Sequence, residues 1–149
     1  MSARTIALDG ALAVAALNGL AGLFGLLRWY RSQASRGFWL LARLGQAIAI
    51  AYAVLAGVLY LANDKPSNDL FYLYAVLPVA IGFVAEQLRI VSADQVLTQR
   101  DLPDAQAVGE LAPEAQREVV VAILRREMLV VALAAIVVCF LALRAWGTY

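Results

Sequence analysis

Residues 44–62 read LGQAIAIAYAVLAGVLYLA, and Gln46 is the only strongly polar side chain among them. An apolar stretch of about 18 or more residues is typical of a helix that crosses the roughly 30 Å hydrocarbon core of a membrane. Outward from this stretch, residues 10–27 form a second such run, interrupted by Asn18. Two shorter uncharged runs lie at 70–85 and 128–143. Together the four runs predict four transmembrane helices.

The two shorter runs are too short to span on apolar residues alone. Sixteen helical residues rise about 24 Å, so these helices must include part of their polar flanks. We therefore predict spans at about 6–27, 39–62, 70–91 and 120–144, with a cytoplasmic segment at about 92–119. The predicted fold is all-α: a single integral membrane domain, 1–149, built as a four-helix bundle. The first run continues past any small-residue cleavage site, so we expect a retained helix rather than a signal peptide.

The composition excludes several classes of function. The chain is 63% hydrophobic and 15% charged, compared with about 45–50% and about 25% in soluble proteins, which favours a protein of the lipid bilayer. The net charge is +1 and the cations are dispersed, which argues against nucleic-acid binding. There is no histidine, and Cys139 is the only cysteine, so we expect no metal site and no cofactor. No phosphate-binding or nucleophile motif is present, and we expect a non-enzymatic protein.

The distribution of cations predicts the orientation. Lysine and arginine near membrane spans are retained on the cytoplasmic side. Nine of the twelve cations lie between the first and second apolar runs or between the third and fourth: Arg28, Arg31, Arg36, Arg43, Arg89, Arg100, Arg117, Arg125 and Arg126. The other three are Arg4, Lys65 and Arg144. Both termini and the loop 63–69 are therefore predicted to be non-cytoplasmic.

Helix-boundary signals divide the region before the last span. Asp101, followed by Pro103 and Asp104, predicts the cap and first turn of a short helix that ends near residue 111. Pro113 and Glu114 predict the start of a long final helix that runs to about residue 145. The first turns of this final helix should project from the membrane.

Small residues predict how the helices pack, because close backbone approach holds helices together in lipid. The second span carries a ridge at four-residue spacing: Gly45, Ala49, Ala53 and Gly57. Asn18 and Gly22 share a face of the first span, and Pro78 and Gly82 share a face of the third. Two interpretations stay open: contacts within one molecule, or an interface with a second copy or another membrane protein.

Polar side chains near the cytoplasmic ends of the spans form the candidate site. Ionisable groups at membrane depth are costly and are therefore functional candidates. The candidates are Arg43, Gln46, Glu86, Arg89, Arg125, Arg126 and Glu127. In one interpretation these groups only form ion pairs that fix helix register. In the other, Arg43 and Arg125 or Arg126 bind an anion, and Glu86 titrates.

Residues 71–78, FYLYAVLP, and 85–89, AEQLR, resemble segments of small uncharacterised bacterial four-helix membrane proteins. The resemblance covers the second to fourth spans and implies no activity. It implies a multi-pass protein of the bacterial inner membrane. Abundant alanine, leucine and arginine alongside a single lysine agree with a GC-rich bacterial genome.

Two functions follow from these observations. The first is a non-enzymatic accessory, scaffold or oligomer-forming subunit, with a second copy or another membrane protein as partner. The alternative is a small oligomeric transporter or channel, with Arg43, Glu86 and Glu127 on its path.

Overall fold

The computed structural model describes residues 2–63 and 65–149, so Met1 and Asp64 of the predicted domain lie outside the described residues. Those residues form α-helices and no strand. The helices are α1 (Ala3–Tyr30), α2 (Arg36–Leu61), α3 (Leu70–Gln99), α4 (Ala105–Gly109) and α5 (Pro113–Thr148). All of them except α4 are long and apolar enough to cross a membrane. The prediction of an all-α chain with four such helices is confirmed.

The helix boundaries follow from local capping chemistry. The Ser2 side chain accepts a hydrogen bond from the Thr5 backbone at the start of α1, and Ser35 caps α2 in the same way. At α4 the predicted cap is wrong: Asp104 caps the helix, whereas Asp101 adopts a left-handed conformation (φ 55°) just after α3. The cause is Pro103, which disfavours helical geometry in Leu102 before it, so a helix that is capped by Asp101 and has Leu102 at its first position is disfavoured.

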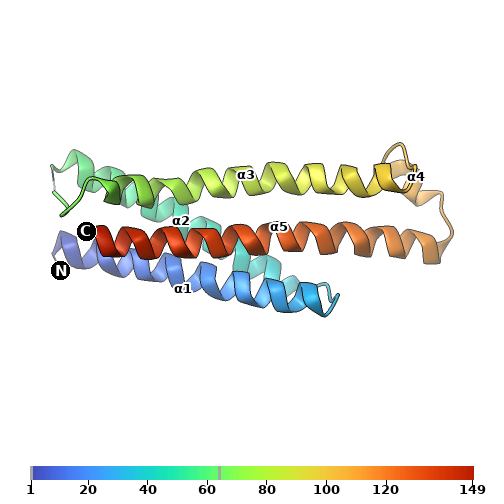
Figure 1. Ribbon diagram of the computed structural model, residues 1–149, viewed down its shortest axis with the longest axis horizontal. Helices are drawn as coiled ribbons and strands as arrows, with labels where there is room; N and C mark the ends of the chain where they lie inside the picture. The colour runs from blue at the N-terminus through green and yellow to red at the C-terminus, as the bar shows by residue number, and fades with distance from the viewer. Residues whose placement is uncertain (1, 64) are drawn as a thin grey trace.

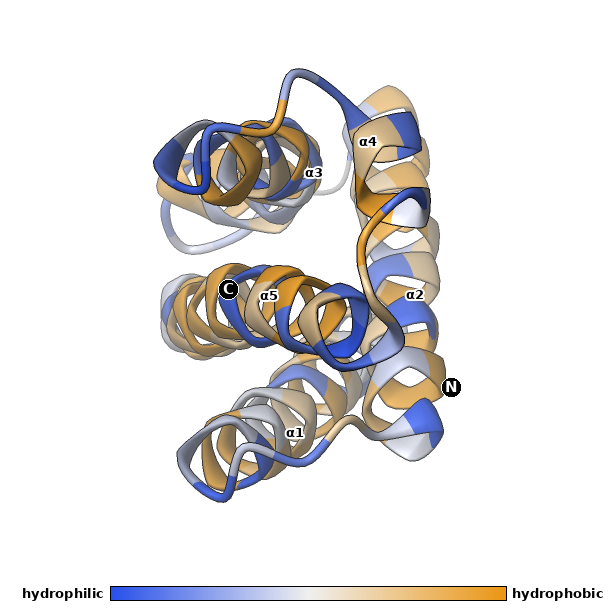
Figure 2. Ribbon diagram, turned by 90° about the vertical axis from the view of Figure 1, so that its right-hand side faces the viewer, coloured by the Kyte–Doolittle hydropathy of each residue, from blue (hydrophilic) through white to orange (hydrophobic). Residues whose placement is uncertain are grey.

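The helices are arranged around α5, which lies between α1 and α3 (Figures 1 and 2). α2 lies beside this row and packs mainly against α1 and α3 (Figure 2). Both termini lie at one end of the bundle together with the α2–α3 connection (Figure 1). There the backbone N–H of Ser67 donates to the carbonyl oxygen of Tyr149 at 3.0 Å, which fastens the connection to the end of α5.

The buried faces follow a heptad-like pattern. In α2 the buried residues are spaced alternately four and three apart: Phe38, Ala42, Gly45, Ala49, Tyr52, Ala56 and Leu59. This spacing is typical of left-handed helix packing. Four-residue steps instead drift around a helix by about 40° each, because a turn takes 3.6 residues. The predicted ridge therefore divides: Gly45 and Ala49 are buried, Ala53 is half-buried, and Gly57 faces open space.

The other predicted packing residues take different places. A Cβ added at Gly22 would overlap the Ile136 side chain, with its nearest atom at 2.6 Å, so α1 and α5 are closely packed at this point. Asn18 packs directly against Gly45 of α2. Pro78 is buried, whereas Gly82 has open space around it.

α3 and α5 continue together beyond the ends of α1 and α2 (Figure 1). We call residues 92–124 the arm; it comprises the last turns of α3, the short helix α4 and the first turns of α5. The arm has its own small apolar core of Val96, Val108 and Val119. Arg100 and Glu118 form an ion pair across it at 3.7 Å. The long final helix, predicted from Pro113, is confirmed as α5, whose 36 residues rise about 54 Å.

Candidate functional site

Glu86 of α3 is the centre of a polar network between α2 and α3. Its Oε1 accepts hydrogen bonds from Arg43 Nη1 at 2.8 Å and from Gln46 Nε2 at 3.2 Å. Its Oε2 forms an ion pair with Arg89 Nη2 at 3.2 Å, one helical turn further along α3. Arg43 also donates to Gln46 Oε1 at 2.8 Å. Four of the seven candidate residues thus form one connected network that joins α2 to α3.

The remaining candidate arginines have other partners. The Arg125 guanidinium lies 5.3 Å from the centre of the Trp29 ring, in a cation–π contact between α5 and α1. Arg126 donates to Gln95 of α3 at 3.4 Å. Arg43 and Arg125 therefore have no partner in common.

Glu127 lies close enough to Arg89 and Glu86 to interact with both electrostatically. It makes no hydrogen bond or ion pair with any residue in 2–63 or 65–149. Arg89 is also incompletely satisfied, since its Nε is buried without a partner, while its guanidinium lies 5.7 Å from the centre of the Trp39 ring. Glu86 is thus held by three partners, whereas Glu127 of α5 is held by none through a hydrogen bond or ion pair within the described residues.

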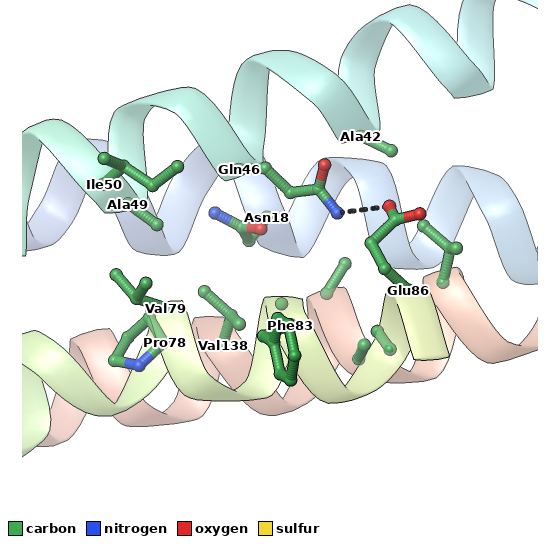
Figure 3. A pocket seen from close by; sticks show the side chains of 15 residues that line it. Asn18, Ala42, Gln46, Ala49, Ile50, Pro78, Val79, Phe83, Glu86 and Val138 are labelled. Atoms are coloured by element: carbon green, nitrogen blue, oxygen red, sulfur yellow. Dashed lines mark hydrogen bonds between the residues drawn. The ribbon is translucent and has the colours of Figure 1, made fainter. Parts of the chain in front are cut away.

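A cavity of about 290 Å³ lies beside this network, between α1, α2, α3 and α5. Figure 3 shows Gln46 and Glu86, joined by their hydrogen bond, with Asn18 close by. The other lining residues are apolar and mostly small, and include Ala42, Ala49, Ala134 and Ala135, together with Pro78 and Gly82. The cavity is therefore a largely apolar chamber with polar groups from three helices.

Among the residues that the structure describes, Asn18 is the most buried of the polar side chains, with only 3% of its surface exposed. Its Nδ2 donates to the carbonyl oxygens of Val14 at 3.0 Å and of Gly45 at 3.1 Å. A Cβ on Gly45 would lie 2.9 Å from the Asn18 Oδ1, so glycine is needed for this close approach. Asn18 thus bonds α1 to the backbone of α2 at one wall of the cavity.

The cavity itself was not predicted from the sequence. Asn18, Pro78 and Gly82 were singled out, but as packing residues. The available signal was a polar side chain in one apolar span opposite small residues in two others. That signal fits direct contact between the helices as well as it fits a cavity, because the relative rotation of the helices decides which of the two forms.

Among the residues that the structure describes, no group of three or more histidine, cysteine, aspartate or glutamate side chains could hold a metal ion. The site instead offers hydrogen-bonding and ion-pairing groups beside an apolar chamber. Comparison of the chain with protein families, with curated proteins and with solved structures finds no match.

Proposed function

We propose that the chain is a multi-pass protein of the bacterial inner membrane that works as a non-enzymatic accessory or oligomer-forming subunit. Its termini lie outside, and the arm lies in the cytoplasm. The observation that carries the proposal is the arm, a paired extension of two spans with its own apolar core. Such an extension offers a partner a well-defined surface on one side of the membrane.

Two tryptophans support this placement of the membrane. Trp29 and Trp39 lie near the inner ends of α1 and α2 and contact Arg125 and Arg89. Tryptophan concentrates at membrane–water interfaces, so these contacts support an inner boundary close to both arginines. The arm then begins just beyond that boundary.

Cysteine labelling tests the orientation. In a Cys139→Ala background, we expect Ser67→Cys to react with a membrane-impermeant maleimide added to intact cells. Gln106→Cys, on exposed α4, should react only after the membrane is opened. Labelling of Gln106→Cys alone in intact cells would overturn the orientation.

Photo-crosslinking in native membranes tests the arm as a contact surface. A photo-crosslinking amino acid at Val120, which is 44% exposed on the arm, should convert the chain into one discrete higher-mass species. The matched control is the same amino acid at Phe140, which is 65% exposed on the membrane-spanning part of α5. A discrete product from position 140 and none from position 120 would overturn the role of the arm.

Gly57 allows a separate test of self-association through α2. An added side chain meets nothing within 4 Å there, so Gly57→Leu should leave the monomer fold intact. If the outward face of α2 joins two copies, Gly57→Leu will lower the oligomeric mass in lipid nanodiscs. Gly147→Leu, also in open space, is the control. An unchanged mass for Gly57→Leu rejects this face as the interface.

A transporter is the second candidate, and one observation favours it: the cavity adjoins Glu86, a carboxylate at membrane depth. If the chain transports protons or small anions, Glu86→Gln will abolish flux in proteoliposomes while the protein remains folded. An unchanged flux, or none in the wild-type protein, rejects transport and favours the accessory role.

A further inference from the structure

The side-chain oxygen of Asn18 accepts no hydrogen bond from any residue that the structure describes, although only 3% of the residue is exposed. The two carbonyl oxygens that face Nδ2 can only accept, so they fix the orientation of the amide. Oδ1 is then the end of the amide that is left to accept: it lies beside Gly45 and has no hydrogen-bond partner in residues 2–63 or 65–149. Asn18 lines the cavity. An amide oxygen with free lone pairs beside an otherwise apolar cavity can accept a hydrogen bond from a molecule that occupies the cavity.

The cavity reaches the outer surface of the bundle between α2 and α3. Two of its lining residues are largely exposed: Ile50 of α2 at 52% and Phe83 of α3 at 67%. Towards the termini the bundle is closed by buried Tyr52 and Phe71. Towards the arm, the Glu86 network lies beside the cavity. These helices are apolar enough to span a membrane, and in the membrane placement proposed above the side opening faces lipid.

We propose that this cavity binds a small hydrophobic molecule that carries one hydrogen-bond donor, such as an alcohol or a phenol, and that enters from the bilayer. The donor bonds to Oδ1 of Asn18, and the hydrocarbon body packs against Ala49, Pro78 and Val138. This inference rests on the membrane placement proposed above but not on the accessory role.

Size and charge narrow the class of ligand. A volume of about 290 Å³ is at the lower end of small-molecule sites, which are about 300–1,000 Å³, so one ring with a short chain fits better than a whole lipid. A charged head group is disfavoured, because burying a charge among apolar walls is costly unless it is paired. Glu86 already accepts from Arg43, Gln46 and Arg89.

Photolabelling of the full chain in lipid nanodiscs tests the proposal. The probes are a phenol with a short diazirine-bearing alkyl chain at the para position and its methyl ether, which lacks the donor. We expect the phenol to label the cavity at Ile50, Phe83 or Val138, and 4-propylphenol to compete. Half-maximal labelling by the ether should need a roughly fivefold higher concentration, since one hydrogen bond is lost.

Two variants separate the hydroxyl contact from the cavity. Asn18→Leu keeps a similar shape, so it should weaken phenol labelling to the level of the ether and leave ether labelling unchanged. Gly82→Leu fills the cavity from a position with open space, so it should abolish labelling by both probes, whereas Gly147→Leu should not. If Asn18→Leu fails to fold, judged by circular dichroism, Gly82→Leu still decides whether the cavity is the site.

Three outcomes would overturn the proposal. Equal labelling by phenol and ether in the wild-type protein rejects the hydrogen bond to Asn18. Labelling that persists unchanged in Gly82→Leu rejects the cavity. If a co-purified lipid chain fills the cavity and 4-propylphenol does not displace it, the proposal of a small donor-bearing ligand is rejected.

Discussion

The substitution Glu86→Gln tests how the polar network holds α2 against α3. The amide keeps one carbonyl oxygen, and two donors, Arg43 and Gln46, face the Oε1 position. We expect the carbonyl to take that side, which places the amide NH₂ group against Arg89. Arg89 then loses its ion pair, although its Nε is already buried without a partner.

The expected loss of unfolding free energy follows from how exposed the partners of Glu86 are. A hydrogen bond to a charged group is worth about 1.5–3 kcal/mol when shielded, and an exposed ion pair about 0–1 kcal/mol. The Arg89 and Glu86 side chains are 27% and 28% exposed, so their pair should lie between these limits, at about 1–1.5 kcal/mol. Arg43 is 53% exposed, and its pair should contribute about 0.5 kcal/mol. Glu86→Gln should therefore lower the free energy of unfolding by about 2 kcal/mol.

The assay is unfolding in mixed micelles with increasing denaturing detergent, followed by far-ultraviolet circular dichroism. Double-mutant cycles with Arg89→Gln and with Arg43→Gln isolate the two pairs. The coupling of Glu86 to Arg89 should exceed its coupling to Arg43. A larger coupling to Arg43, or a loss below about 0.5 kcal/mol for Glu86→Gln, would refute this assignment of the network.

Three further predictions concern packing. Gly25→Ala should lower the free energy of unfolding by about 1–3 kcal/mol, because an added Cβ would overlap the Phe38 ring. The control is Gly57→Ala, which adds its Cβ in open space and should be neutral or slightly stabilising in the same assay. Tyr52→Phe should lower the free energy of unfolding by about 1 kcal/mol, because the Tyr52 hydroxyl donates to a backbone carbonyl of α1 at 3.1 Å. An unchanged free energy of unfolding would show that this hydrogen bond does not stabilise the fold. Val119→Ala should raise hydrogen exchange in the arm and leave the spans protected, because Val119 is 1% exposed in the separate core of the arm; uniform destabilisation would contradict that separation.

Much of the fold follows from the sequence, because membrane spans and helix starts have strong local causes. Residues 44–62 and 10–27 are long apolar runs, and helices formed over both of them. Proline at a first helical turn predicted the start of α5 at Pro113. The start of α4 was placed wrongly, since Asp101 and Asp104 are both good caps and only the backbone restriction by Pro103 separates them.

The rotation of each helix could not be predicted in the same way. The ridge from Gly45 to Gly57 looks continuous at four-residue spacing, yet the packed face follows alternating steps of four and three. Which face is buried depends on the helices on either side, and small residues occur on several faces of α2. This is also why the void beside Asn18 has no signature in the sequence.

The depth of the candidate site residues along their helices could be predicted from the sequence, but the partner of each side chain could not. Arg43, Glu86 and Arg89 were expected at one depth, and the structure bonds them together. Arg125 has the same charge at a comparable depth and lies over Trp29. Depth follows from hydropathy along the chain, whereas the choice of partner depends on the angle at which each side chain leaves its helix.

The length of α5 has a mechanical consequence. From Pro113 at its first turn to Thr148 it is a single helix, and its only proline is the one at the start. Sharp kinks in helices occur mostly at an internal proline, which α5 does not have. A rotation of about 5° about its C-terminal end moves its N-terminal end, about 54 Å away, by about 5 Å. In the orientation proposed above, a small tilt of α5 at the outer surface would displace its cytoplasmic end without any hinge inside the membrane.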